Sequence, residues 1–246
     1  MDRMDLPPGF GIPGDASEAL WLDGRYGTQA GRPVAEAFPP GFTDFVRVLH
    51  PAWRRHGSTV RWSEAFHARA RMLDAEASWF RHFGDVPDPE FTTPEDGSLP
   101  QPEATIVASS LLEHTTTPED CWFVWSPVRG LPFDTGTPLV RFRRPWDPWR
   151  MRRAAIRRSR DAMRLQRSLP SAGGGVLVRG PLGALVEVAP TPVPSVWWPA
   201  DHAWIVATGV DAVSTYIGAM PDCIDAIVHD PRLETLKVAS TNTIVV

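Results

Sequence analysis

Short runs of β-branched and aromatic residues, bounded by proline and glycine, constrain most strongly what this chain of 246 residues can fold into. Runs of this composition favour strands, above all strands buried in a sheet. Because helical patterns lie between them without strict alternation, we predict an α+β fold, a single domain with helices flanking a mostly antiparallel central sheet. The expected strands are 43–50, 121–126, 176–188, 203–209 and 233–238.

Three stretches near this sheet carry more specific expectations. The segment VLVRGPLGALVEV, 176–188, is predicted to be a hairpin whose turn runs from Gly180 to Gly183. The segment STYIG, 214–218, is predicted to continue the strand at 203–209. The stretch SVWWPADHAW starts at 195 and places three tryptophans within eight residues. Since each indole buries a large area, we interpret these tryptophans as core residues at a strand entrance.

Helical spacing of apolar residues marks several further segments. The stretch RWSEAFHARARMLDAEASWFRHFG, 61–84, is interpreted as one helix that Ser63 can cap and that Gly84 ends. A second helix is expected over 103–115, and a third begins with Pro221. Residues 1–40 are rich in glycine and proline, and we treat them as an N-terminal segment before a domain at 41–246.

The positive charge of the chain is concentrated in one place. Between Arg141 and Arg167 there are eleven arginines and two acids, which gives a net charge of +9, although the whole chain carries −4. The rest of the chain therefore carries −13. Asp147 and Pro148 are typical of a helix start, so we predict an arginine-rich helix over 147–168 within a basic helical insertion at 141–170, preceded by a strand at 137–145.

This charge asymmetry predicts contacts rather than fold. Three interpretations are open: the arginines are solvated and balanced by the protein's own acids, including the loop 85–96; they bind an acidic protein partner; or they bind nucleic acid. We predict a non-catalytic protein that binds an acidic protein, with nucleic acid as the alternative, because a net −13 elsewhere would repel a long polyanion. The expected contact residues are Arg144, Trp146, Trp149, Arg150, Arg152, Arg153, Arg157, Arg158, Arg160 and Arg164.

Two residue pairs are weak candidates for catalysis. Cys121, with His114 seven residues before it, needs a nearby cation to become a nucleophile, but two acids directly precede it. Asp201 and His202 are adjacent in an extended stretch, so their side chains point to opposite faces and do not form the orienting pair of a triad. We therefore expect no catalytic site, with a hydrolase or transferase that uses an aromatic pocket as the enzyme alternative.

Other functional classes lack their sequence signals. The chain has no run of 18 apolar residues and no signal-peptide pattern at its start, so we expect a cytoplasmic protein without a membrane partner. Two cysteines argue against a disulfide framework. The histidines and acids lack metal-ligand spacing, and we expect no metal and no cofactor.

Five stretches of the chain resemble an uncharacterised family of actinobacterial proteins: PPGFTDFVRVLHPA, RWSEA, HTTTPEDCWFVW, VWWPADHAWIVATGVDAVSTYIG and DPRLETL. The resemblance covers most of the chain in patches, and it implies that these patches belong to one fold. It implies no catalytic residues, and the arginine-rich segment looks like an elaboration of that pattern.

Overall fold

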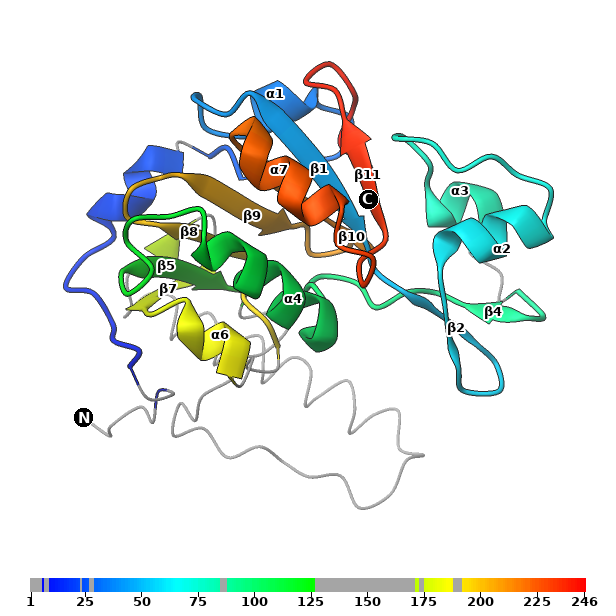
Figure 1. The fold of residues 1–246 in the computed structure, drawn as a ribbon, viewed down its shortest axis with the longest axis horizontal. Helices are drawn as coiled ribbons and strands as arrows, with labels where there is room; N and C mark the ends of the chain where they lie inside the picture. Colours follow the sequence, from blue (N-terminus) through cyan, green and yellow to red (C-terminus); the bar gives the residue numbers. More distant parts are fainter. Residues whose placement is uncertain are drawn as a thin grey trace, which may run out of the picture.

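The computed structural model describes residues 6, 9–22, 24–26, 29–84, 88–126, 171–172, 175–187 and 192–246. Within these residues the chain forms an eight-stranded sheet and a separate three-stranded sheet, with helices packed against both (Figure 1). Every pair of neighbouring strands in the two sheets is antiparallel. The predicted α+β fold with an antiparallel central sheet is therefore confirmed.

The large sheet has the strand order β11-β1-β10-β9-β8-β5-β7-β6. Four of the predicted strands are confirmed, as β1, β5, β9 and β11. Three strands of the large sheet were not predicted as such: β6, β8 and β10. The bounds are β1 (Asp44–Leu49), β5 (Cys121–Trp125), β6 (Ser171–Ala172), β7 (Gly175–Gly180), β8 (Val196–Pro199), β9 (Trp204–Thr208), β10 (Ser214–Ala219) and β11 (Thr235–Val238).

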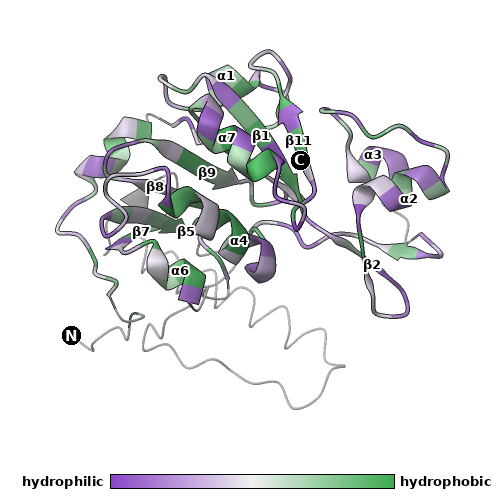
Figure 2. Cartoon of the chain, viewed as in Figure 1, coloured by the Kyte–Doolittle hydropathy of each residue, from purple (hydrophilic) through white to green (hydrophobic). Residues whose placement is uncertain are grey.

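Both faces of the large sheet are covered, which explains why its strands are apolar without alternation. One core lies beneath α4 (Gln101–Leu112), α6 (Gly183–Glu187) and α7 (Pro221–Val228) (Figure 1). The other lies beneath the 3-10 helix η1 (Ser17–Leu22) and α1 (Val34–Ala37). Successive strand residues enter opposite cores, as Trp197 and Trp198 do. Figure 2 shows the central strands β5 and β9 as mostly hydrophobic.

The prediction of a hairpin at 176–188 is wrong. Strand β7 ends at Gly180, and the chain then forms α6 instead of a second strand. Pro181 has no N–H to donate to a sheet ladder. Leu182 and Leu185, three residues apart, are both fully buried in the core that α4 covers, which is the spacing of a helix. The Leu182 N–H also donates to the Pro118 carbonyl at 2.8 Å, which turns the chain away from the sheet.

The prediction that 214–218 continues the strand at 203–209 is also wrong, because the two segments form a hairpin. The Ala212 N–H donates to the Gly209 carbonyl at 3.0 Å, which reverses the chain, and Thr215 then pairs with Thr208. Strand β8 escaped prediction because Pro199 interrupts its sequence. Pro199 is the last residue of β8, opposite Cys121, so the missing N–H falls where the strand ends.

A small unit projects from one end of the large sheet (Figure 1). It has its own aromatic core, which includes Trp62, Phe66, Trp79 and Phe91. In Figure 2 its helices carry both hydrophobic and hydrophilic residues. Its elements are β2 (Ala52–Arg54), β3 (Thr59–Val60), β4 (Phe91–Thr92), α2 (Trp62–Ala68) and α3 (Trp79–Phe83), with the strand order β3-β2-β4.

The single helix predicted over 61–84 is instead two short helices. The chain leaves α2 at Arg69 and passes through Ala70 with φ 51°, a left-handed conformation that ends a helix. The following loop presents the carbonyls of Ala75 and Ala77 to Arg47 of β1, so these groups serve a tertiary contact instead of a helical ladder. Helix α3 then starts at Ser78, whose side chain accepts from the Arg81 N–H.

The predicted cap of α2 is wrong, whereas the predicted end of α3 is confirmed. Ser63 does not cap α2: the Glu234 carboxylate accepts from the N–H groups of Trp62 at 2.6 Å and Ser63 at 2.7 Å. This carboxylate comes from the far end of the sequence and suits the positive end of the helix. Gly84, with φ 73°, ends α3.

The helices predicted over 103–115 and from Pro221 are confirmed as α4 and α7. The predicted strand at 137–145, the arginine-rich helix at 147–168 and the insertion at 141–170 lie outside the described residues. Among the helices that the structure describes, none is long and apolar enough to cross a bilayer.

Candidate functional site

Cys121 is placed where a thiol is inert. It is the first residue of β5 and is fully buried, with Sγ 3.7 Å from the carbonyl oxygens of Thr117 and Pro118. Burial, followed by the charges of Asp120 and Asp201, raises the pKa of the thiol to about 12. His114 lies just beyond α4, and no hydrogen bond joins it to Cys121 in the described part of the chain. The pair therefore does not form a nucleophile and base.

We predict that neither cysteine reacts with Ellman's reagent in the folded protein. Cys223 is buried as well, and burial raises its pKa to about 12, so both thiols are protonated and shielded at neutral pH. Absorbance of the released thiolate should count no thiol under native conditions and both in denaturant, with Cys121→Ser leaving one. Rapid native reaction that Cys121→Ser removes would restore Cys121 as a candidate nucleophile.

Asp201 organises a loop rather than a catalytic histidine. Its carboxylate accepts from the Thr116 N–H at 2.6 Å and from the hydroxyls of Thr116 and Thr115 at 2.8 and 2.9 Å. Its own N–H donates to Thr117 Oγ1 at 3.1 Å. Burial opposes ionisation, but hydrogen bonds from Thr116, Ala203 and Thr115 outweigh it and lower the pKa of Asp201. The carboxylate is thus committed to residues 115–117.

His202 faces a different partner, so the two adjacent residues form no acid-base pair. Its ring stacks on Trp21 of η1, with centroids 4.0 Å apart and planes 5° apart. Burial lowers the pKa of the imidazole, which Glu18 and Asp201 partly oppose. Trp197, Trp198 and Trp204 are fully buried, which confirms their interpretation as core.

Arg47 was not predicted as special, yet it is a fully buried arginine on β1. Its Nε donates to Ser214 Oγ at 2.8 Å, and Nη1 donates to the Ala77 carbonyl at 2.7 Å. The guanidinium lies 5.5 Å from the Trp62 ring centre and 5.7 Å from that of Tyr216. Burial lowers its pKa, which Tyr216 and Asp74 oppose. This side chain joins the large sheet to the small unit.

His50 is the second buried polar group at this junction. Its Nδ1 contacts the Glu95 carbonyl at 2.6 Å and its Nε2 contacts Thr215 Oγ1 at 2.9 Å, while Thr215 and Thr208 hydroxyls lie 2.7 Å apart. Burial, and to a lesser degree Arg47, lowers the pKa of His50 to about 4. The imidazole is therefore neutral at pH 7. The sequence signal for Arg47 and His50 was their position in the apolar run DFVRVLH, where a charged and a titratable side chain are unexpected.

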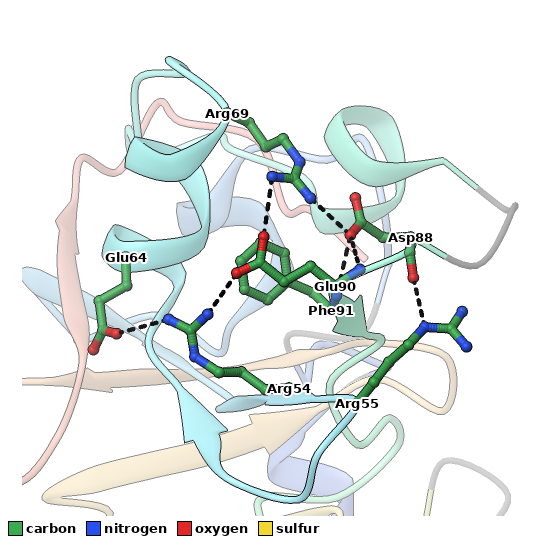
Figure 3. A network of polar contacts seen from close by, with 7 residues as sticks. All are labelled: Arg54, Arg55, Glu64, Arg69, Asp88, Glu90 and Phe91. Atoms are coloured by element: carbon green, nitrogen blue, oxygen red, sulfur yellow. Dashed lines mark hydrogen bonds and ion pairs between the residues drawn. The ribbon is translucent and has the colours of Figure 1, made fainter.

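A network of ion pairs in the small unit involves the loop 88–90 (Figure 3). Arg69 binds the carboxylates of Asp88 at 2.9 Å and Glu90 at 3.3 Å, and Arg54 binds Glu90 at 2.6 Å. The guanidiniums of Arg54 and Arg69 lie 5.4 and 5.1 Å from the ring centre of Phe91. Two acids of the loop 85–96 are therefore already paired with arginines of their own unit.

The predicted contact residues lie outside the described residues: Arg144, Trp146, Trp149, Arg150, Arg152, Arg153, Arg157, Arg158, Arg160 and Arg164. Among the described residues no group of three or more histidines, cysteines and acids is placed to hold a metal ion. Comparisons of the chain with family models, curated proteins and solved structures found no match. The resemblance to actinobacterial proteins stays a prediction.

Proposed function

We propose that this protein acts by contact rather than by catalysis, and that its basic segment, residues 141–167, binds an acidic protein partner. The observation that carries the proposal is the net charge of +9 within this segment of a chain whose remainder carries −13. Such a segment attracts an acidic surface, while the remaining negative charge disfavours a long polyanion. The cytoplasm is the proposed compartment, supported by two free, buried cysteines.

Two structural observations support this proposal. Asp88 and Glu90 were candidates to neutralise the basic segment internally, but both are engaged by Arg54 and Arg69. The weak catalytic candidates also have structural roles: Cys121 is buried with a raised pKa, and Asp201 holds a threonine loop. These roles lower the weight of the hydrolase or transferase alternative.

Nucleic acid is the second candidate, because Trp146 and Trp149 lie among the arginines and indoles stack on bases. Probes of equal net charge distinguish the two candidate partners. An acidic protein is represented by a polyglutamate peptide, and nucleic acid by single-stranded and double-stranded oligonucleotides of matched net charge.

The test compares the wild type with a variant that changes Arg152, Arg153, Arg157 and Arg158 to glutamate. We expect polyglutamate to bind the wild type, with an affinity that falls as salt rises, and the glutamate variant to lose binding by at least about tenfold. The same four residues changed to lysine keep the charge and should keep most of the binding.

The outcomes separate the candidates. If only oligonucleotides bind, and the glutamate variant loses them, the nucleic-acid function replaces the proposed one. If the wild type binds neither probe at moderate salt, or if the glutamate variant binds as the wild type does, the proposal is wrong. Fluorescence anisotropy of labelled polyglutamate and labelled oligonucleotides, measured across a salt series, distinguishes these outcomes.

A further inference from the structure

Four rings gather on the face of the large sheet that η1 and α1 cover. We name them the indole cluster: Trp21, Trp122, Trp198 and His202. Trp122 of β5 pairs in register with Trp198 of β8, so both side chains lie on the same face. Trp21 of η1 lies 6.1 Å from Trp198 and stacks on His202 at 4.0 Å, centroid to centroid. Residues far apart in the sequence thus form one aromatic group.

Three polar atoms of the indole cluster have no hydrogen-bond partner among the residues that the structure describes. They are Nε1 of Trp122, Nε1 of Trp198 and Nε2 of His202, and all three are buried. Leaving a buried donor unpaired costs about 1–3 kcal/mol, so such groups need a reason. Other buried indoles do find acceptors: Trp62 Nε1 donates to the His50 carbonyl at 2.8 Å, and Trp125 Nε1 to the Pro192 carbonyl at 2.8 Å.

Trp197 and Trp204 also have unpartnered indole N–H groups within the described residues, but they lie in the other core and are fully buried. The indole cluster differs because it reaches the surface. Trp21 and His202 are half-buried, and Trp122 is 7% exposed. His202 is also one of two non-glycine residues with positive φ, at 55°, in the described chain.

The cover over this cluster is one short helix. Helix η1 has six residues; Leu22 is buried in the core, whereas Leu20 is 78% exposed. The edge of the cluster is polar: the Arg179 guanidinium lies 5.6 Å from the Trp122 ring centre and is paired with Asp120. A flat molecule that replaced Trp21 would meet the His202 ring on one face, in a cluster that also holds the unpartnered indole N–H groups of Trp122 and Trp198.

We propose that the indole cluster binds a planar heteroaromatic small molecule whose edge accepts hydrogen bonds. Its ring stacks on His202 in the place that Trp21 takes here, and its acceptor atoms bond the N–H groups of Trp122 and Trp198. The site is independent of the basic segment, so its failure would leave the proposed function untouched. Binding is noncovalent.

The test uses two probes of the same size and shape. Quinoxaline has two ring nitrogens that accept hydrogen bonds, and naphthalene has none. In spectra of ¹⁵N-labelled protein, quinoxaline should shift the indole N–H signals of Trp122 and Trp198, which Trp122→Phe and Trp198→Phe assign. Trp21→Ala should bind quinoxaline about tenfold more tightly than the wild type, because it removes the competing ring.

The matched control is Trp53→Ala, which removes a tryptophan that is 45% exposed on the small sheet and should leave quinoxaline binding unchanged. If Trp21→Ala does not fold, Trp21→Leu replaces it in the test, because leucine keeps an apolar cover without a flat ring. Equal affinity for quinoxaline and naphthalene would show an apolar hole without recognition, and would overturn the proposal. So would quinoxaline shifts that spare both indole signals.

Discussion

Replacing Arg47 with alanine should lower the free energy of unfolding by about 3–5 kcal/mol, the range for breaking a buried charged network and leaving a hole in a core. The guanidinium is fully buried and holds Ser214 on one side and the carbonyls of Ala75 and Ala77 on the other. Alanine would leave these groups unpaired and would remove the contacts of the guanidinium with the rings of Trp62 and Tyr216.

Unfolding in urea, followed by tryptophan fluorescence, measures the loss. Arg71→Ala is the control, because Arg71 is an exposed arginine in the loop after α2 and should change stability by less than about 0.5 kcal/mol. A loss below about 1 kcal/mol in Arg47→Ala would mean that water replaces the guanidinium at little cost. The junction between the sheet and the small unit would then not depend on Arg47.

The folded protein should lose about 3 kcal/mol of stability between pH 6.5 and pH 4 through His50 alone. Burial lowers the pKa of His50 to about 4, below the unfolded value of 6.5. In this window the unfolded state therefore binds more protons than the folded state, so stability is full above pH 6.5 and falls as the pH drops towards 4. His202, whose pKa is also lowered, acts in the same direction.

The variant His50→Asn should flatten the stability profile between pH 6.5 and 4.5, measured as urea midpoints at a series of pH values. His67→Asn, at an exposed position of α2, should keep the wild-type slope. Carboxylates with lowered pKa, such as Asp201 and Glu76, act below this window, because their stabilisation is lost as the pH falls below about 4. An unchanged slope in His50→Asn would contradict the buried, neutral state of His50.

Much of the sheet could be predicted because local composition decides it. Strands β1, β5, β9 and β11 are short apolar runs bounded by turn residues, and the structure has them within two residues of the predicted ends. Burial of Trp197, Trp198 and Trp204 followed from their size. The inert state of Cys121 followed from its apolar strand and its acidic neighbours.

Three of the errors have a common cause, which is a partner far away in the sequence. Residues 183–187 form helix α6, with Leu182 and Leu185 buried in the core that α4 covers. Residues 69–78 leave the helix predicted there, with Arg47 binding two of their carbonyls. Glu234, and not Ser63, caps α2. None of these partners can be recognised from local spacing.

The sequence by itself determined the α+β class, four strands of the large sheet and the concentration of positive charge in one segment, because these depend on residue type and order along the chain. Only the tertiary structure decided which polar groups meet. In the folded chain Asp201 accepts hydrogen bonds from the loop 115–117, and His202 stacks on Trp21. Glu90 pairs with Arg54 and Arg69. The physical reason is that hydrogen bonds and ion pairs act over a few ångströms, and only folding brings distant residues that close.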